Sequence, residues 1–356
     1  MLCESPLDSY LQEDLDYVVS HCAVLEQLKN RSVLVTGATG LVGSLLVKTL
    51  ACYNRKHQGN ITVYLFVRNL EKAKTIFGEV LDRDNIHVIV GDITDTTALP
   101  SVDYVFHCAS VTASKTMVTQ PVETIATAMD GTKNILEYAK LRGIRSLVYL
   151  SSMEMYGSFE DCQTPITEEM SGYVNPLLTR SNYPLSKRLC ENLCVAYSVE
   201  YGLDVKIARL AQTFGAGVLP GENRVFAQFA RSAMNGTDIV LHTKGLSEGN
   251  YCYTADVIDG LFRILLCGEN GSAYNVVNEN THTTIAAMAQ MVAEKLAEKP
   301  IAVVFDIPET NLHGYAQDTK MRLSSVKLRT LDWEPKVDLE EAYHRLMGSM
   351  RAQNMV

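Results

Sequence analysis

The 356-residue sequence predicts an α/β protein with a doubly wound parallel sheet and a smaller mixed α/β cap. Three observations predict this fold class. Short β-rich apolar runs alternate with helical stretches, a glycine-rich turn joins the first run to the first helix, and the rhythm loosens beyond Ala211. Alternation of this kind is typical of parallel strands with right-handed helical crossovers, which place helices on both faces of one sheet.

The first part of the chain, residues 1–30, precedes this alternation. Within 7–29, apolar residues such as Leu11, Leu15 and Val18 recur at helical spacing. A striped helix of this kind packs its apolar side on a core. We therefore expect an N-terminal helical extension.

Residues 31–212 are expected to form the sheet domain. Its helices are predicted near 41–53, 70–80, 120–142 and 183–201. Its strands are predicted at 32–36, 61–67, 86–90, 103–107, 145–150 and 204–209.

Residues 213–356 are expected to form the cap, with segments that return to the sheet domain. Gly215, Gly217, Pro220 and Gly221 indicate a loop at its start. Strands are predicted near 238–242 and 273–277, and helices near 223–235, 283–298 and 338–350. A cap over the carboxyl ends of the strands predicts one cleft shared by both parts.

Composition excludes several classes of partner. The formal net charge of −9 opposes binding to a phosphodiester backbone, so we expect no nucleic-acid partner. No apolar run reaches the ~20 residues that span a bilayer, and the acidic N-terminus does not look like a secretory signal. The nine cysteines are scattered without a C-x-x-C pair, which predicts free thiols, no metal site and a cytoplasmic protein.

A glycine loop follows the first predicted strand and opens the first helix. Glycine suits this position because the turn is tight and the backbone must approach a pyrophosphate. The amino end of the helix then presents free N–H groups and a positive dipole to phosphates. The sequence therefore predicts a dinucleotide site, with candidate binding residues Gly37, Thr39, Gly40, Leu41, Val42 and Gly43.

The end of the second strand leaves NAD and NADP both open. An acidic residue there would bind a ribose hydroxyl, but the sequence has Arg68, which is able to accept a 2′-phosphate. After the third strand, Asp92 and Ile93 are suitably placed for the adenine, and Asp92 is able to accept a hydrogen bond from its amino group. We name NAD as the expected cofactor, with NADP possible.

A catalytic group is predicted where the fifth strand ends and the helix near 183–201 begins. Tyr183 and Lys187 lie four residues apart and share one helix face, so the ammonium favours a phenolate. A phenolate takes the proton from a sugar hydroxyl while hydride leaves for the nicotinamide. Ser152, at the end of a neighbouring strand, would hydrogen-bond the same hydroxyl, and Lys187 would hold the nicotinamide ribose.

The ordered motifs T-G-x-x-G-x-x-G, G-D-I, H-C-A-S, S-S-M-E-M-Y-G and Y-P-L-S-K resemble the extended short-chain dehydrogenase/reductases called NAD-dependent epimerase/dehydratases, over residues 31 to 345. The resemblance implies a Rossmann-type sheet, transient oxidation of a nucleotide sugar at C4, and a homodimer through the helices near 120–142 and 183–201. It also makes Ala109 and Ser110 of H-C-A-S candidate cofactor-binding residues.

The branch that the chain most resembles is that of the UDP-glucuronate decarboxylases. The match assigns Ser152, Tyr183 and Lys187 as the catalytic trio and adds Glu154, which stands where decarboxylases and 4,6-dehydratases carry a glutamate. Met153 replaces the aspartate that dehydratases add. Candidate substrate-binding residues are Arg180, Gln212 and Arg224.

Two departures from this resemblance keep other functions open. The family usually has Asn at Gln212 and an Arg at Gly249, and an Arg is a bidentate phosphate partner. A non-catalytic nicotinamide-binding protein would explain these departures. Arg68 instead favours an NADPH-dependent carbonyl or keto-sugar reductase.

Overall fold

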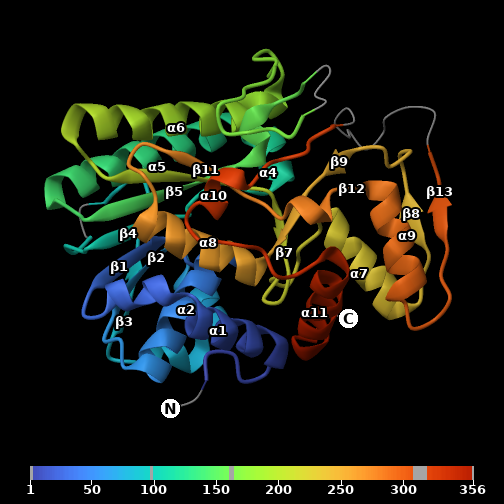
Figure 1. Ribbon diagram of the computed structural model, residues 1–356, viewed down its shortest axis with the longest axis horizontal. Helices are drawn as coiled ribbons and strands as arrows, with labels where there is room; N and C mark the ends of the chain where they lie inside the picture. Colours follow the sequence, from blue (N-terminus) through green and yellow to red (C-terminus); the bar gives the residue numbers. More distant parts are fainter. Residues whose placement is uncertain (1–2, 97–98, 160–163, 308–318, 355–356) are drawn as a thin grey trace.

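A computed structural model of the chain describes residues 3–96, 99–159, 164–307 and 319–354. Its centre is a seven-stranded sheet of order β11-β6-β5-β4-β1-β2-β3, in which all neighbours run parallel (Figure 1). The strands are β1 (Ser32–Thr36), β2 (Thr62–Val67), β3 (Ile86–Val90), β4 (Tyr104–His107), β5 (Ser146–Ser152), β6 (Val205–Leu210) and β11 (Ala273–Val276). The strand order reverses between β1 and β4, which is where doubly wound sheets bind ligands.

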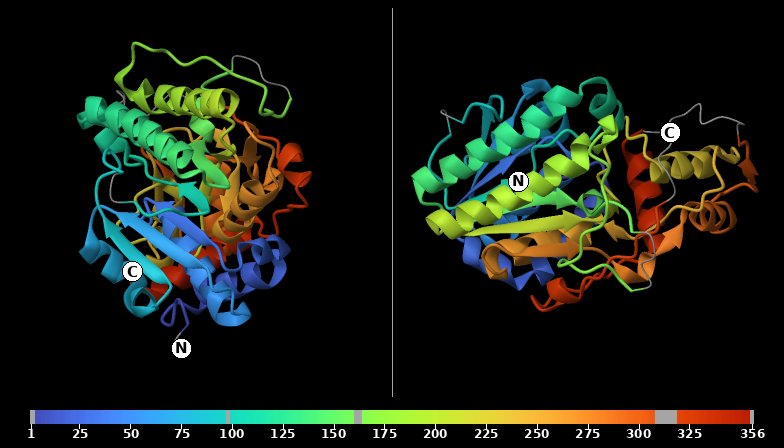
Figure 2. Two further views of the ribbon diagram at one scale, coloured as in Figure 1. Left: turned by 90° about the vertical axis from the view of Figure 1, so that its left-hand side faces the viewer. Right: turned by 90° about the horizontal axis from the view of Figure 1, so that it is seen from above.

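Helices cover both faces of this sheet, as predicted. One face carries α5 (Pro121–Arg142) and α6 (Asn182–Tyr201), which run side by side in Figure 2. The other carries α2 (Leu41–His57), α3 (Leu70–Phe77) and α8 (Thr254–Cys267). Successive residues of β1 point to opposite faces, so that Val33 and Val35 join one core cluster and Leu34 joins the other.

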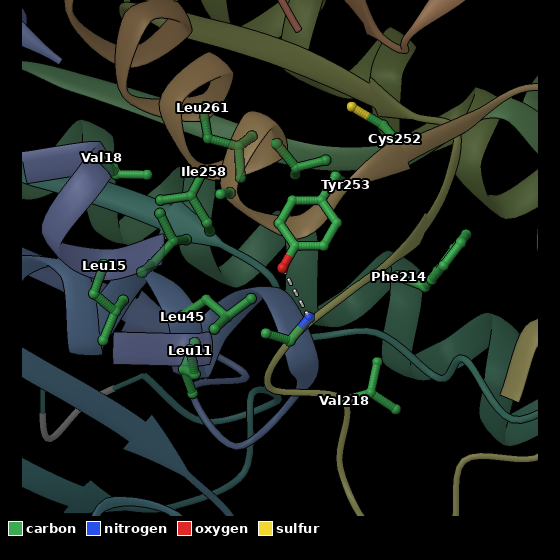
Figure 3. Packing of buried hydrophobic residues seen from close by; sticks show 14 of the residues in the cluster. Leu11, Leu15, Val18, Leu45, Phe214, Val218, Cys252, Tyr253, Ile258 and Leu261 are labelled. Carbon is green, nitrogen blue, oxygen red and sulfur yellow. Dashed lines mark hydrogen bonds between the residues drawn. The ribbon is translucent and has the colours of Figure 1, made fainter. Parts of the chain in front are cut away.

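The N-terminal extension forms a third layer over α2 and α8. Helix α1 (Ser9–His21) is capped by the Asp8 carboxylate, which accepts from the Leu11 N–H, and buries Leu11 beside Leu45 of α2 (Figure 3). The predicted single helix over 7–29 is interrupted, because Cys22 leaves helical geometry and a 3-10 helix η1 (Ala23–Leu28) follows. Ser349 of the last helix donates to Asp8, so both chain ends meet here.

The second part of the chain divides between the cap and the sheet. Strand β11, one of the two short strands predicted in this part, joins the central sheet beside β6. Helix α8 had no counterpart among the predicted elements. The cap elements are β7 (Gln212–Phe214), α7 (Val225–Asn235), β8 (Ile239–Leu241), β9 (Glu248–Gly249), β10 (Tyr251–Tyr253), β12 (Thr283–Thr284), α9 (Ile285–Lys295), β13 (Val303–Phe305) and α11 (Leu339–Ala352).

Short helices fill several connections. They are α4 (Ser114–Thr119), α10 (Val326–Arg329) and the 3-10 helices η2 (Gly78–Asp82), η3 (Met153–Tyr156), η4 (Thr179–Ser181) and η5 (Glu279–Thr281). Within the described ranges, the chain has no helix with the length and apolarity to cross a membrane. The same residues contain no group of three or more His, Cys, Asp or Glu side chains arranged to hold a metal ion.

Candidate active site

The glycine loop is shaped by two close backbone approaches. Gly37 has φ +63°, and a Cβ at this position would lie 2.8 Å from the backbone nitrogen of Ala109. A Cβ on Gly43 would lie 2.5 Å from the carbonyl oxygen of Gly37. Both positions therefore require glycine. Helix α2 begins at Leu41, so the N–H groups of its first turn, including those of Leu41, Val42 and Gly43, are available to a phosphate.

The residues at the end of β4 hold the glycine loop in shape, because Ala109 packs directly against Gly37. The Ala109 N–H donates to Thr36 Oγ1 over 3.2 Å, and Thr36 Oγ1 lies 2.8 Å from His107 Nδ1. His107 Nε2 lies 3.3 Å from Thr132 Oγ1 of α5. Burial lowers the pKa of His107 to about 3, so the ring is a neutral link between strands and helix. It holds the half-buried Ala109 against the loop.

This His107 link was not among the predicted site residues. The signal for it was present in the H-C-A-S motif, whose histidine directly precedes Cys108. Ser110, the last residue of that motif, is half-buried just beyond Ala109, at the position where the strand order reverses. Both residues of the motif that we predicted to bind the cofactor therefore lie at the ligand-binding edge of the sheet.

The adenosine end of the predicted site lies at the ends of β2 and β3. Arg68 is exposed after β2, and the Asp92 carboxylate accepts from the N–H and hydroxyl of Thr94 at 2.9 and 2.7 Å. These hydrogen bonds, aided by the charge of Arg68, lower the pKa of Asp92. Ile93 is buried against Gly131 of α5. Asp92 is thus an ionised acceptor beside the Arg68 cation.

Ser152, Tyr183 and Lys187 come together at the carboxyl end of β5. Ser152 ends the strand, and its hydroxyl accepts from the Glu154 N–H over 3.2 Å and interacts with the phenol of Tyr183. Lys187 follows Tyr183 by one turn of α6, and its Nζ lies 5.7 Å from the centroid of the Tyr183 ring. The exposed fractions are 9% for Tyr183 and 3% for Lys187. Both side chains are therefore held in a nearly dry environment.

Burial opposes charge on both of these groups. It raises the pKa of Tyr183 to about 12, with a contribution of the same sign from the Glu154 charge. The interaction with Ser152 and the charges of Arg180 and Arg224 lower the pKa of Tyr183. Burial lowers the pKa of Lys187 to about 8. Deprotonation of the phenol in this site hence depends on the positive charges that face it.

Glu154 and Arg180 form an ion pair at the opening of the site. Arg180 Nη2 donates to Glu154 Oε2 over 2.9 Å and lies 3.3 Å from Oε1. Each side chain is 37% exposed, and the Arg180 guanidinium lies 5.7 Å from the Tyr183 ring centroid. The predicted residues Glu154 and Arg180 thus lie beside the phenol and pair with each other.

The cap contributes the remaining candidates. Gln212 begins β7, where it pairs with Tyr251, and is half-buried. Arg224 is exposed before α7, and its Nη2 lies 2.6 Å from Glu222 Oε2. Among these cap residues, the Arg224 charge is the one that acts on Tyr183. At Gly249, a Cβ would meet no heavy atom within 4 Å, so this position has room for a longer side chain.

A buried ion pair behind the trio was also missed by sequence reasoning. Arg209 of β6 donates to Glu191 of α6 at 2.7 Å through Nη2 and at 3.1 Å through Nε. Ser151 donates to the same carboxylate. Glu191 lies four residues after Lys187, so its spacing indicated a partner for that lysine. The structure gives it to Arg209 instead.

Known proteins match this fold and these motifs over most of the chain. A model of the NAD dependent epimerase/dehydratase family matches residues 33–278. UDP-glucuronic acid decarboxylase 6 of Arabidopsis thaliana is 31% identical over 313 residues, which cover 88% of this chain and 86% of the relative. UDP-glucuronic acid decarboxylase 1 of Danio rerio is 29% identical over 90% of this chain and 73% of its own length.

Solved structures agree with this assignment. An epimerase from Methanothermobacter thermautotrophicus has a TM-score of 0.79 and 26% identity, covering 92% of this chain and 94% of its own. UDP-glucose 4-epimerase from Thermotoga maritima has a TM-score of 0.74 at 22% identity, over 91% of this chain and 99% of that protein, and shows the fold alone. The predicted fold, family and NAD cofactor are confirmed. The chain belongs to the NAD-dependent epimerase/dehydratase family, and its curated relatives named above are enzymes that modify nucleotide sugars.

Proposed function

We propose that this chain decarboxylates a nucleotide-linked uronic acid after oxidising its sugar at C4. One observation carries the proposal: Ser152, Tyr183 and Lys187 meet beside an ionic opening that contains Glu154 and Arg180. The relatives that are UDP-glucuronic acid decarboxylases support the same reaction.

Tyr183 is the proposed base in the oxidation. Its phenolate takes the proton from the C4 hydroxyl, while Ser152 hydrogen-bonds the same oxygen. NAD, when bound, supplies the acceptor for the C4 hydride. The N–H groups of Leu41, Val42 and Gly43 would bind its pyrophosphate, and Lys187 would stabilise the phenolate and bind the nicotinamide ribose.

The C4 ketone makes loss of the carboxyl group favourable. A carboxylate on C5 is then a β-keto acid, so the C5–C6 bond breaks, carbon dioxide leaves, and the electron pair moves to the C4 oxygen. Tyr183, now protonated, stabilises that oxygen. Glu154 would relay a proton from solvent to C5, and Arg180 would orient the anionic substrate before the bond breaks. The C4 ketone would then regain its hydride from the reduced cofactor and a proton from Tyr183, so that no net oxidation of the sugar remains.

The test is an assay of the purified full chain on nucleotide sugars. UDP-glucuronate, UDP-galacturonate, UDP-glucose, dTDP-glucose, GDP-mannose and CDP-glucose are each incubated with the enzyme and NAD, with carbon dioxide capture and NMR of the product. Release of carbon dioxide from a uronic acid supports the proposal. Formation of an epimer would instead identify the chain as an epimerase, and formation of a 4-keto-6-deoxy sugar would identify it as a 4,6-dehydratase.

Two other outcomes separate the remaining alternatives. Net consumption of NADPH with a ketone substrate would identify a reductase and give Arg68 a role in cofactor choice. Binding of NAD without its reduction by any sugar would identify a non-catalytic nicotinamide-binding protein. Unchanged turnover in Tyr183→Phe would overturn the assigned base.

We further propose that two copies of this chain pair through α5 and α6. The outer faces of these helices carry exposed apolar side chains, among them Val122, Ile125, Leu189 and Val199. Two parallel-packed helices from each copy would bury this surface in a four-helix contact. We expect light scattering to give the mass of a dimer. Leu189→Glu should give the mass of a monomer with an unchanged thermal unfolding temperature.

The cytoplasm is the proposed location. All eight cysteines that the structure describes are free thiols, which favours a reducing compartment. Imaging of a tagged full-length chain tests this assignment.

A further inference from the structure

The ammonium of Lys187 is buried without a carboxylate partner. Its Nζ donates to the Leu150 carbonyl oxygen over 2.7 Å. Among the residues that the structure describes, no carboxylate oxygen lies within 4.0 Å of this nitrogen. A buried charge normally requires a partner, since desolvation disfavours its charged form.

The expected carboxylate is present but engaged elsewhere. Glu191 lies four residues after Lys187 on α6, the spacing at which helical ion pairs form. Its two oxygens accept from Arg209 and Ser151. These contacts hold the carboxylate away from Lys187.

An aromatic ring takes the place of this carboxylate. Tyr149 of β5 is buried, and its ring centroid lies 4.8 Å from Lys187 Nζ, nearer than the ring of Tyr183 at 5.7 Å. The negative face of an aromatic ring attracts a cation, most strongly where water is excluded. We propose that Tyr149 is a positioning residue whose ring, with the Leu150 carbonyl, holds the Lys187 ammonium in place of a counter-ion.

The choice of a ring has a consequence for Tyr183. A carboxylate beside Lys187 would cancel the positive field at the phenol, whereas a neutral ring stabilises the ammonium and leaves its unit charge in force. This role rests on the proposed function, in which the phenolate of Tyr183 is the base. The titratable groups that face Lys187 are His107 of β4, Cys108 just after it, Tyr149 of β5, and Tyr183, Cys190, Glu191 and Cys194 of α6.

The first test compares pH–rate profiles of the NAD-loaded enzyme. In Tyr149→Leu the ammonium loses its ring, Lys187 deprotonates more readily, and the phenolate is less stabilised. We expect the apparent pKa of the acidic limb of the pH–kcat profile to rise by about one unit, which lowers kcat about tenfold at a given pH on that limb. Tyr149→Phe keeps the ring and should restore the wild-type limb.

Tyr274→Leu is the matched control for packing. Tyr274 lies on β11 at the edge of the same sheet and is as deeply buried as Tyr149. Lys327 Nζ lies 5.0 Å from the centroid of its ring. Its substitution should lower stability without moving the acidic limb. An equal shift in Tyr274→Leu, or a Tyr149→Leu variant that loses rate evenly at all pH values, would show that Tyr149 acts through packing alone.

A graded series avoids dependence on a variant that fails to fold. Phenylalanine and its mono-, di- and trifluoro derivatives at position 149 keep the ring shape and weaken its negative face stepwise. We expect the acidic limb to rise with each fluorine. A limb that stays constant through the series would overturn the proposal.

A measurement without turnover separates this proposal from the proposed function. The Nζ resonance of Lys187 is titrated by NMR in protein labelled at lysine, and its signal is identified by its loss in Lys187→Met. The pKa of Lys187 should fall in Tyr149→Leu and stay in Tyr149→Phe, whether or not any sugar is turned over. Equal Lys187 pKa values in both variants refute the role of the ring even in an active enzyme.

Discussion

The sheet side and the cap side of the candidate site are built differently. On the sheet side, Tyr183 and Lys187 are buried, and the glycine loop is held by backbone contacts that leave no space for a Cβ. On the cap side, Arg224 is exposed and pairs with its near neighbour Glu222. Rigid, buried groups suit the oxidation step that we propose. A solvated side, whose ion pairs are able to change partners, suits the recognition of a substrate.

The largest effect should come from the sheet side. Tyr183→Phe removes the oxygen that we propose takes the substrate proton, and it keeps the buried ring. We expect kcat to fall by about 10²–10⁴-fold with NAD binding retained. Single-turnover reduction of bound NAD, followed by absorbance, measures this directly. A loss confined to KM would contradict the division between the two sides.

The glycine loop should be nearly as sensitive. Gly37→Ala places a Cβ 2.8 Å from Ala109 at φ +63°, so we expect a loss of about 1–3 kcal/mol in stability together with weaker NAD binding. Gly143→Ala is the control, because Gly143 has φ +61° but no heavy atom within 4 Å of the added Cβ. Calorimetric titration with NAD should separate them. Equal NAD affinity in both variants would show that backbone strain, rather than the close approach, limits this position.

The cap side should respond in KM. Arg224→Ala removes an exposed cation, and we expect KM to rise about tenfold, equivalent to about 1.4 kcal/mol. The fall in kcat should be small, because burial, Glu154, Ser152 and Arg180 all act on the pKa of Tyr183 more strongly than Arg224 does. Arg224→Lys should recover part of the loss, since it keeps the charge without the planar fork. Steady-state kinetics decide this. An equal fall in kcat would place Arg224 with the sheet-side groups.

The His107 link predicts a modest acid sensitivity of the sheet side. Its folded pKa of about 3 lies below its ordinary value of 6.5, so below pH 6.5 the unfolded chain binds a proton that the folded chain does not. Stability should therefore fall as the pH drops from about 6.5 toward 3, by about 1.4 kcal/mol per pH unit from this group. Urea unfolding at pH 7.5 and 5.5 should show a smaller difference in His107→Asn. An unchanged difference would assign the acid sensitivity to other groups.

Local pattern was sufficient for the sheet and the glycine loop. The predicted strands 32–36 and 86–90 coincide with β1 and β3, because each is a short, mostly apolar run with a polar residue before it and a glycine after it. Helix α8 was overlooked although its pattern was present in the sequence: Asp256, Asp259 and Arg263 recur at helical spacing among apolar residues.

Pairings between distant residues could not be read from the sequence. The Glu154–Arg180 ion pair joins residues 26 positions apart, and the diversion of Glu191 to Arg209 depends on how α6 lies against β6. The sequence put Glu191 one helical turn after Lys187 and Tyr149 on a strand, without indicating which residue either side chain would face. Such contacts are fixed by the packing of elements rather than by their periodicity.

The junction of the two chain ends bears on how the protein is made. Asp14 of α1 pairs with Arg345 of α11 at 2.8 Å, and Ser349 donates to Asp8 across 341 positions of the sequence. A chain emerging from the ribosome completes α1 first and α11 last, so the N-terminal layer remains without its final partner throughout synthesis. The junction therefore closes only once α11 has been made, and a chain stalled before α11 would leave the carboxylates of Asp8 and Asp14 without these partners.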